Sequence, residues 1–95
     1  MRKKKEEIQK ENQDKLVKSI NNLDIIVKTD NIPKNIRNKL KEIIVLLNDE
    51  KVGSISVRAA NAVSMMESMT QNHQVQSHIR TMIWQAISSL ESIRE

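Results

Sequence analysis

Apolar residues recur at helical spacing in four stretches of the chain, and short polar clusters separate these stretches. The first stretch predicts a helix over about residues 6–28, because its apolar residues follow the three- and four-residue steps of one buried stripe. The positions expected to be buried are Leu16, Val17, Ile20, Leu23, Ile26 and Val27. Upstream of Leu16 only Ile8 is apolar, so we expect the beginning of this helix to be exposed.

The same periodicity predicts three more helices, over about 33–48, from Ser54 or Ser56 to about 69, and from Val75 or Gln76 to about 94. Pro33 fits the first turn of the second helix, where its missing N–H costs nothing, and a serine can cap the third. The core positions expected in these helices are Ile36, Leu40, Ile43, Ile44 and Leu47, then Ala59, Ala62, Val63, Met66 and Met69, and finally Ile79, Met82, Ile83, Ala86, Ile87, Leu90 and Ile93.

A β-branched residue followed by arginine marks the start of each of these three helices. The pairs, separated by 21 and then 22 residues, are Ile36-Arg37, Val57-Arg58 and Ile79-Arg80. A period this short is one helix plus one turn, so the chain consists of helix–turn units that must pack together to bury their apolar stripes. Loops of a few residues place consecutive helices side by side and antiparallel.

We therefore predict an all-α fold, a four-helix up-and-down bundle built from repeated helix–turn units, with a longer basic N-terminal helix. A short helical solenoid is the alternative, but units of this length would create little concave surface. Residues 1–14 are expected to form a basic, partly exposed helical extension, and residues 15–95 a single helical-bundle domain.

Composition narrows the class of protein. One glycine, one proline and no phenylalanine or tyrosine disfavour an all-β fold, and the absence of cysteine excludes disulfides and thiolate metal sites. The longest apolar run, Ile43–Leu47, has five residues, whereas a transmembrane helix needs about 20. The basic N-terminus is followed by Glu6 and Glu7 instead of the apolar region of a signal peptide. We expect a cytoplasmic protein with no membrane partner.

Four short stretches of the chain are similar to a known family. They are Ile32–Arg37, Val57–Ala62, Arg80–Trp84 and Leu90–Glu95. From about residue 20 onward the chain resembles a group of small archaeal proteins, uncharacterised protein family 0147. The resemblance implies a compact four-helix bundle, and because the activity of the family is unknown it implies no functional residues. The family usually has a proline before the second and third arginine, where this chain has Ser54 to Ser56 and Gln76.

Arg37, Arg58 and Arg80 are candidates for a structural role. A cation in the first turn of a helix lies against the positive end of the helix dipole, at a cost of about 0.3–1 kcal/mol. Three repeats of that cost indicate that each guanidinium has a partner. A structural partner is a carboxylate or the free C-terminal carbonyls of an adjacent antiparallel helix, and a functional partner is a phosphate or an acidic protein surface. We favour the structural interpretation, because internal repetition is what maintenance of the fold would produce.

Trp84 is the only aromatic residue, and it lies among apolar residues of the fourth predicted helix. We expect it to be a structural core anchor in contact with methionines of the third helix, because sulfur–aromatic contacts are favourable. Met65 and Met66 are adjacent and cannot both face inward. One of them is therefore a candidate for an exposed contact, since methionine-rich surfaces adapt to partners.

Nothing in the chain supports catalysis. His73 and His78 are five residues apart, which does not match the i, i+4 spacing of helical metal ligands. The serines of the helix bodies have no neighbouring base, and a single glycine cannot form a phosphate-binding loop. We expect a protein that is not an enzyme and uses no cofactor, metal or small-molecule substrate.

Two functions remain. The first is a non-catalytic interaction module that docks on a protein partner, on a macromolecular assembly or on a second copy of itself. The alternative is an RNA- or ribonucleoprotein-associated protein that holds the phosphate backbone, since no aromatic residue is free to stack on bases. The candidate partner or phosphate contacts are Lys3, Lys4, Lys5, Lys34, Arg37, Lys41 and Arg80.

Overall fold

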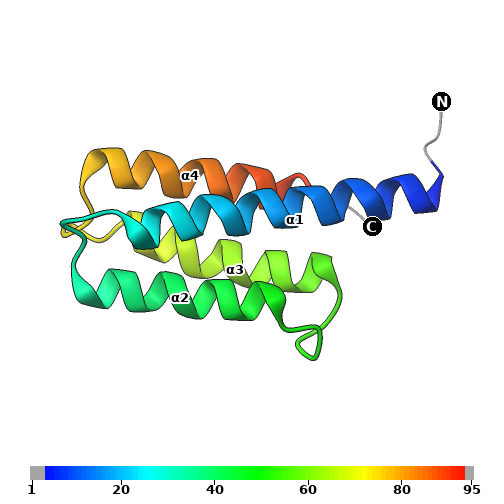
Figure 1. Ribbon diagram of the computed structural model, residues 1–95, viewed down its shortest axis with the longest axis horizontal. Coiled ribbons are helices and arrows are strands. Elements are labelled where there is room, and N and C mark those ends of the chain that lie inside the picture. Colours follow the sequence, from blue (N-terminus) through cyan, green and yellow to red (C-terminus); the bar gives the residue numbers. More distant parts are fainter. Residues whose placement is uncertain (1–3, 94–95) are drawn as a thin grey trace.

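The structure, a computed structural model, describes residues 4–93 and contains four helices in that range. They are α1 (Lys5–Lys28), α2 (Lys34–Asn48), α3 (Ile55–Thr70) and α4 (Ser77–Glu91). Consecutive helices run in opposite directions along the long axis of the molecule (Figure 1). The predicted all-α four-helix bundle is confirmed. Arg94, the predicted end of the last helix, lies outside the described residues.

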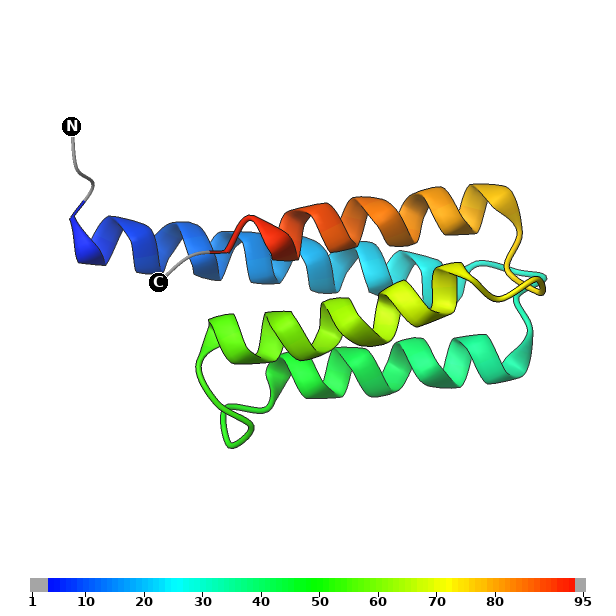
Figure 2. The same cartoon turned by 180° about the vertical axis from the view of Figure 1, so that it is seen from behind.

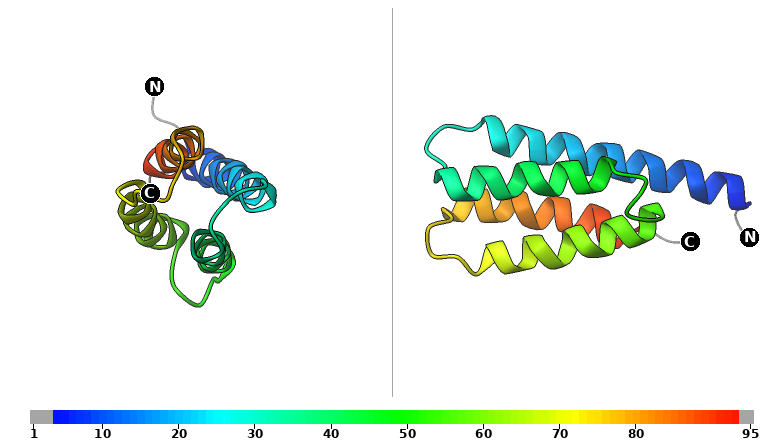
Figure 3. Two further views of the ribbon diagram at one scale, coloured as in Figure 1. Left: turned by 90° about the vertical axis from the view of Figure 1, so that its left-hand side faces the viewer. Right: turned by 90° about the horizontal axis from the view of Figure 1, so that it is seen from below.

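The four helices form a square when the bundle is viewed along its axis (Figure 3). α1 packs against α2 and α4, and α3 packs against the same two helices. α1 and α3 also approach each other across one diagonal, whereas α2 and α4 do not across the other. The face formed by α1 and α2 is therefore opposite the face formed by α3 and α4.

The loops that follow α1 and α3 lie together at one end of the bundle (Figures 1 and 2). A hydrogen bond from Asn35 Nδ2 to Gln74 Oε1, 3.4 Å long, joins the first turn of α2 to the loop before α4. At the other end α1 extends past the ends of the remaining helices (Figure 3). α1 runs without interruption through residue 14, and we keep the division into an extension, 1–14, and a bundle domain, 15–95, as a proposal.

The core is formed by one stripe from each helix and by two loop residues, Ile32 and Val75. The buried apolar residues of the helices are Leu16, Leu23, Ile26, Ile36, Leu40, Ile43, Leu47, Ala59, Ala62, Met66, Met69, Ile79, Ile83, Ala86, Ile87 and Leu90. Val17, which was expected in the core, is 46% exposed. Its neighbour Leu16 takes the inward position, and the next residue lies about 100° further round a helix.

Local sequence explains how α2 and α3 begin. Pro33 is the residue just before α2, one position earlier than predicted, and its extended backbone leads into the helix. Ser54 precedes α3, and its hydroxyl accepts a hydrogen bond from the Val57 N–H at 3.3 Å. Gly53 has a φ of 152°, a conformation that side-chain-bearing residues rarely adopt.

Candidate functional site

The three repeated arginines occupy the same position in their helices. Each is the fourth residue, and its backbone N–H closes the first helical turn on the carbonyl of the residue just before the helix. Those acceptors, at 3.0, 3.0 and 2.9 Å, are Pro33 O, Ser54 O and Gln76 O. From this shared position each arginine side chain reaches back to the end of the preceding helix.

Arg37 and Arg80 close the ends of α1 and α3 in the same way. Arg37 Nε donates to Val27 O at 3.0 Å, and its Nη2 donates to Thr29 O at 3.1 Å. Arg80 Nε donates to Thr70 O at 2.8 Å, and its Nη2 donates to Val75 O at 3.1 Å. Both side chains are partly buried. Each guanidinium therefore satisfies a carbonyl that the end of a helix leaves without an intrahelical donor, together with a carbonyl of the segment that follows the helix.

Arg58 is the most enclosed of the three, with 7% of its surface exposed. Its Nη1 donates to Leu47 O at 2.8 Å, next to the last residue of α2. Its Nε donates to Gly53 O at 3.1 Å and to Ser54 O at 3.4 Å. One charged side chain thus fastens the end of α2, the connecting loop and the start of α3 to one another.

The end of α4 receives a cation from the first helix. Lys15 Nζ donates to Ser92 O at 2.8 Å, one residue after α4 ends. All four helices therefore direct C-terminal carbonyls, the negative end of the helix dipole, at a lysine or arginine of another helix. The role of Lys15 was not predictable from the sequence, because its position on α1 carries no repeat and no local signal that relates it to a residue far along the chain.

Within residues 4–93 no carboxylate pairs with these arginines. The ion pairs of that range are Lys28–Asp24 at 2.8 Å and Lys39–Glu42 at 3.8 Å, each within a single helix. Of the two structural partners considered from the sequence, the backbone carbonyls are the ones in contact. We propose that the arginines stabilise the helix ends. In Arg37 and Arg80 the hydrogen bonds to carbonyls use guanidinium N–H groups that would otherwise be available to a phosphate.

The remaining candidate phosphate contacts do not gather into one patch. Lys4 and Lys5 lie at the projecting start of α1, while Lys34 begins α2 at the opposite end of the bundle. A helix the length of α1, with 24 residues, separates those ends by about 36 Å. Lys41 lies midway along α2 and is exposed. Lys3 lies outside the described residues.

The fold separates the charge of the chain between its two faces. Residues 15–48, which form most of α1 and all of α2, hold seven lysines and arginines against three acidic residues. Residues 54–93, which contain α3 and α4, hold two of each. The α1–α2 face is therefore basic, and the α3–α4 face is close to neutral.

Trp84 is not the core anchor that the sequence predicted. Its side chain lies on α4 and is 45% exposed, whereas the preceding residue, Ile83, is fully buried. Adjacent helical residues point in directions about 100° apart, so only one of the two can face the core. Met66 is buried and Met65 is only partly buried. Two adjacent residues of a helix cannot both face the core, as the sequence indicated.

A shallow groove of about 420 Å³ runs between α3 and the end of α4. Most residues of its α3 wall are small, including Ala60 and Ser64, and Glu91 lies on its α4 side. Trp84 precedes Glu91 by seven residues, which places both on the same side of α4. Trp84 therefore lies on the same side of α4 as Glu91, which lines the groove.

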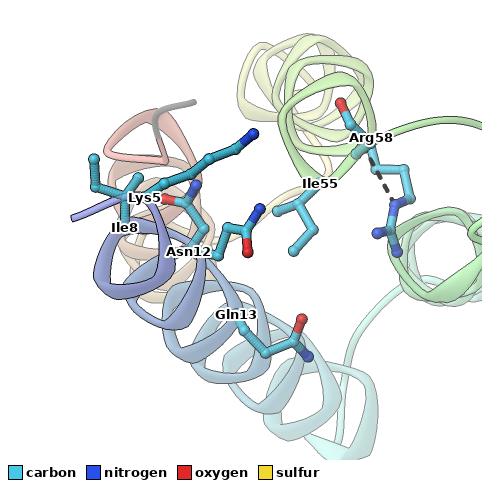
Figure 4. Close-up of a pocket in the computed structure, with 8 residues that line it drawn as sticks. Lys5, Ile8, Asn12, Gln13, Ile55 and Arg58 are labelled. Carbon is cyan, nitrogen blue, oxygen red and sulfur yellow. Dashed lines mark hydrogen bonds between the residues drawn. The ribbon is translucent and has the colours of Figure 1, made fainter.

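A larger pocket, about 860 Å³, lies at the end of the bundle where α1 projects (Figure 4). One wall is the first part of α1 and the other is the start of α3. The lining residues are Lys5, Ile8, Gln9, Asn12, Gln13, Ser54, Ile55 and Arg58. Among the lining residues that the structure describes, two are cationic and none is acidic.

The two histidines lie near the start of α4 and were considered as metal ligands. His73 lies in the loop before α4 and His78 in the first turn of α4, and both are exposed. Across residues 4–93, no group of three or more histidine, aspartate and glutamate side chains is placed to hold a metal ion. None of the helices in that part of the chain is long and apolar enough to cross a membrane.

Comparisons with known proteins agree with the resemblance seen in the sequence. Residues 3–93 match the model of an uncharacterised protein family, UPF0147. The chain is 34% identical to a UPF0147 protein of Sulfurisphaera tokodaii, covering 90% of this chain and 94% of that protein. It is 37% identical to a UPF0147 protein of Methanosarcina acetivorans over 75% of this chain and 72% of the relative.

A solved structure has the same fold. The crystal structure of a protein of unknown function, MMP1188, is similar with a TM-score of 0.82 and 30% sequence identity. The similarity covers 87% of this chain and 93% of that one.

Proposed function

The chain belongs to the uncharacterised protein family UPF0147, and we propose that it is a non-catalytic interaction module that docks on a protein partner through its α3–α4 face. This face consists of the exposed outer residues of the two helices beside the shallow groove. They are Ala60, Ser64 and Glu67 on α3, and Trp84, Ser88 and Glu91 on α4.

The exposure of Trp84 carries the proposal. A tryptophan buries more apolar area on binding than any other side chain and is enriched among residues that dominate binding energy. Here the only aromatic residue of the chain is 45% exposed on the side of the molecule that has almost no net charge. Small neighbours on α3 let a partner approach the helix backbone closely, and the groove provides a concave surface beside the indole.

Affinity capture from native extract tests this function with Trp84→Ala and a matched control, Gln85→Ala. Gln85 is the next residue of α4 and is also exposed, but it points about 100° away. In nuclease-treated extract, a protein retained by the wild type and by Gln85→Ala should be lost from Trp84→Ala. Loss from neither variant, or equal loss from both, would refute docking at this face.

Intrinsic fluorescence provides a second measurement, because Trp84 is the only tryptophan and there is no tyrosine. Addition of the captured partner should shift the emission to shorter wavelength and protect the indole from a soluble quencher. If concentrating the protein alone produces the same change, the partner at this face is a second copy of the chain.

RNA binding through the phosphate backbone is the second candidate, and the basic α1–α2 face favours it. Lys34 and Lys41 are the exposed contacts proposed there, while the carbonyl bonds of Arg37 and Arg80 weigh against those two side chains. Titration of a structured RNA at two salt concentrations tests it. Lys34→Gln and Lys41→Gln should each reduce the salt slope by about 1, and an absence of binding at low salt would exclude this function.

A further inference from the structure

The large pocket exists because one helix is longer than its neighbours. The first part of α1 continues past the ends of the other helices (Figures 1 and 3), and we call residues 5–11 the α1 overhang. The side of α1 that faces the core further along, at Leu16, Leu23 and Ile26, has no complete helix opposite it in the overhang. The start of α3 provides the facing wall.

Two apolar side chains are among the lining residues of the pocket. Ile8 on the overhang and Ile55 on α3 are both partly buried, and they line opposite walls (Figure 4). Ile8 is the only apolar residue among residues 4–15, and it lines the pocket. It is partly buried, whereas most of the polar residues around it are exposed. A ligand between these walls would cover apolar surface that the bundle itself leaves open to water.

The charge of the lining is one-sided. Lys5 is exposed at the outer edge of the pocket, and Arg58 is buried on the α3 side (Figure 4). The carbonyl oxygens of Leu47 and Gly53 accept hydrogen bonds from Arg58 without neutralising its charge. Within residues 4–93, no carboxylate lines the pocket and none pairs with Arg58. The remaining walls carry carboxamides, which both donate and accept hydrogen bonds.

We propose that this pocket binds a ligand that carries a carboxylate on an apolar body. The apolar part lies between Ile8 and Ile55, and the carboxylate faces Lys5. The volume of about 860 Å³ falls in the range of about 300–1,000 Å³ that is typical of small-ligand sites. The same chemistry is present in the C-terminal residue of a partner polypeptide and in a free fatty acid. This site is separate from the α3–α4 face and does not depend on the function proposed for it.

Nuclear magnetic resonance titration of the full chain tests the proposal with octanoate and octan-1-ol, which share an apolar chain and differ in charge. Octanoate should shift the backbone amide signals of the lining residues. Octanol should bind about tenfold more weakly or worse, because it lacks the charge-assisted contact. Equal binding of the two probes, or no octanoate shifts at the pocket up to millimolar concentration, would overturn the proposal.

Charge-reversal variants locate the contact. Lys5→Glu should weaken octanoate binding by about tenfold, as expected for loss of one charged contact. Lys18→Glu makes the same charge change at another exposed position of α1 and should leave the affinity unchanged. Equal weakening in both variants would show that octanoate responds only to net charge and would refute a pocket.

A third arm distinguishes the two sources of the ligand. The peptide acetyl-Ala-Ala-Ala-Leu is titrated with a free and with an amidated C-terminus. Tighter binding of the free peptide than of octanoate assigns the pocket to a polypeptide C-terminus, and the reverse order assigns it to a fatty acid. Ile8→Asp should abolish binding of either probe while melting as the wild type, because Ile8 lies on the overhang and outside the packed core. Retained binding in that variant would contradict the proposed geometry.

Discussion

Replacing Arg58 with methionine removes the most enclosed of the three guanidinium groups and keeps an unbranched apolar side chain in its place. In the folded protein Arg58 is 7% exposed and donates to Leu47 O, Gly53 O and Ser54 O. Ser54 O would retain the backbone N–H of residue 58, 3.0 Å away. Leu47 O and Gly53 O would lose the donor that Arg58 provides, at a point where α2, the loop and α3 meet.

The expected loss follows from these two carbonyls. A hydrogen bond to a charged group contributes about 1.5–3 kcal/mol, so losing two would destabilise the fold by about 3–6 kcal/mol. The variant also avoids burying a cation that pairs with no carboxylate of residues 4–93, which offsets part of the loss. We expect a net decrease of about 2–4 kcal/mol in the free energy of unfolding, within the range of buried-network mutations. For a domain of this size the melting temperature should fall by at least about 8 °C.

Urea unfolding followed by circular dichroism measures this decrease, provided that the slope of the transition stays that of the wild type. Lys41→Met is the matched control, because it removes an exposed cation from a helix surface and should change stability by no more than about 0.5 kcal/mol. Arg37→Ala and Arg80→Ala should also lower the melting temperature, by less than Arg58→Met, since both side chains are only partly buried. If all three arginine variants melt as the wild type, the carbonyl contacts do not stabilise the fold and the arginines become candidates for binding an anion.

Three further changes test the core, a loop and the N-terminal extension. Ser19→Ala should raise the free energy of unfolding by about 1 kcal/mol, because the hydroxyl is fully buried and has no hydrogen-bond partner among residues 4–93. A lower urea midpoint would mean that the hydroxyl is satisfied in solution. Gly53→Ala should lower the free energy of unfolding by about 1–3 kcal/mol, because the φ of Gly53 is 152° and an added Cβ would lie 3.0 Å from Val57 Cγ1. Unchanged calorimetric melting would show that the loop relaxes without cost. Deleting residues 1–14 should leave a folded bundle, because Asn12 is the only described residue of that segment that is buried. A loss of helical circular dichroism far beyond the deleted length would contradict the proposed domain boundary.

Periodicity explains why the helices and their order were predictable. The steps of three and four residues between Ile36, Leu40 and Ile43 are the geometry of an α-helix and require no knowledge of a partner. The even spacing of Arg37, Arg58 and Arg80 similarly indicated helix–turn units of one length. Local chemistry also predicted the serine cap of α3. Each of these features is decided by residues close together in the chain.

Positions at the edge of a stripe were less predictable. Val17 and Trp84 each follow a buried residue, and both are nearly half exposed. At such positions the direction of a side chain depends on the angle and spacing of the neighbouring helices, which local sequence does not specify. The loop residues Ile32 and Val75 are buried for the same reason, since the ends of other helices leave space that they fill.

The amino-acid sequence by itself determined that this protein is a bundle of four helices and that three arginines recur at equivalent points of it. Only the tertiary structure decided what those arginines contact, that Lys15 completes the set at α4, and that Trp84 faces outward. It also created the pocket, because α1 and α3 run in the same direction through the bundle and bring Ile8 and Ile55 to the same end. Helical periodicity is a property of neighbouring residues, whereas a cap from another helix or a pocket between helices depends on how whole helices pack, and that packing is settled by burial over the entire chain.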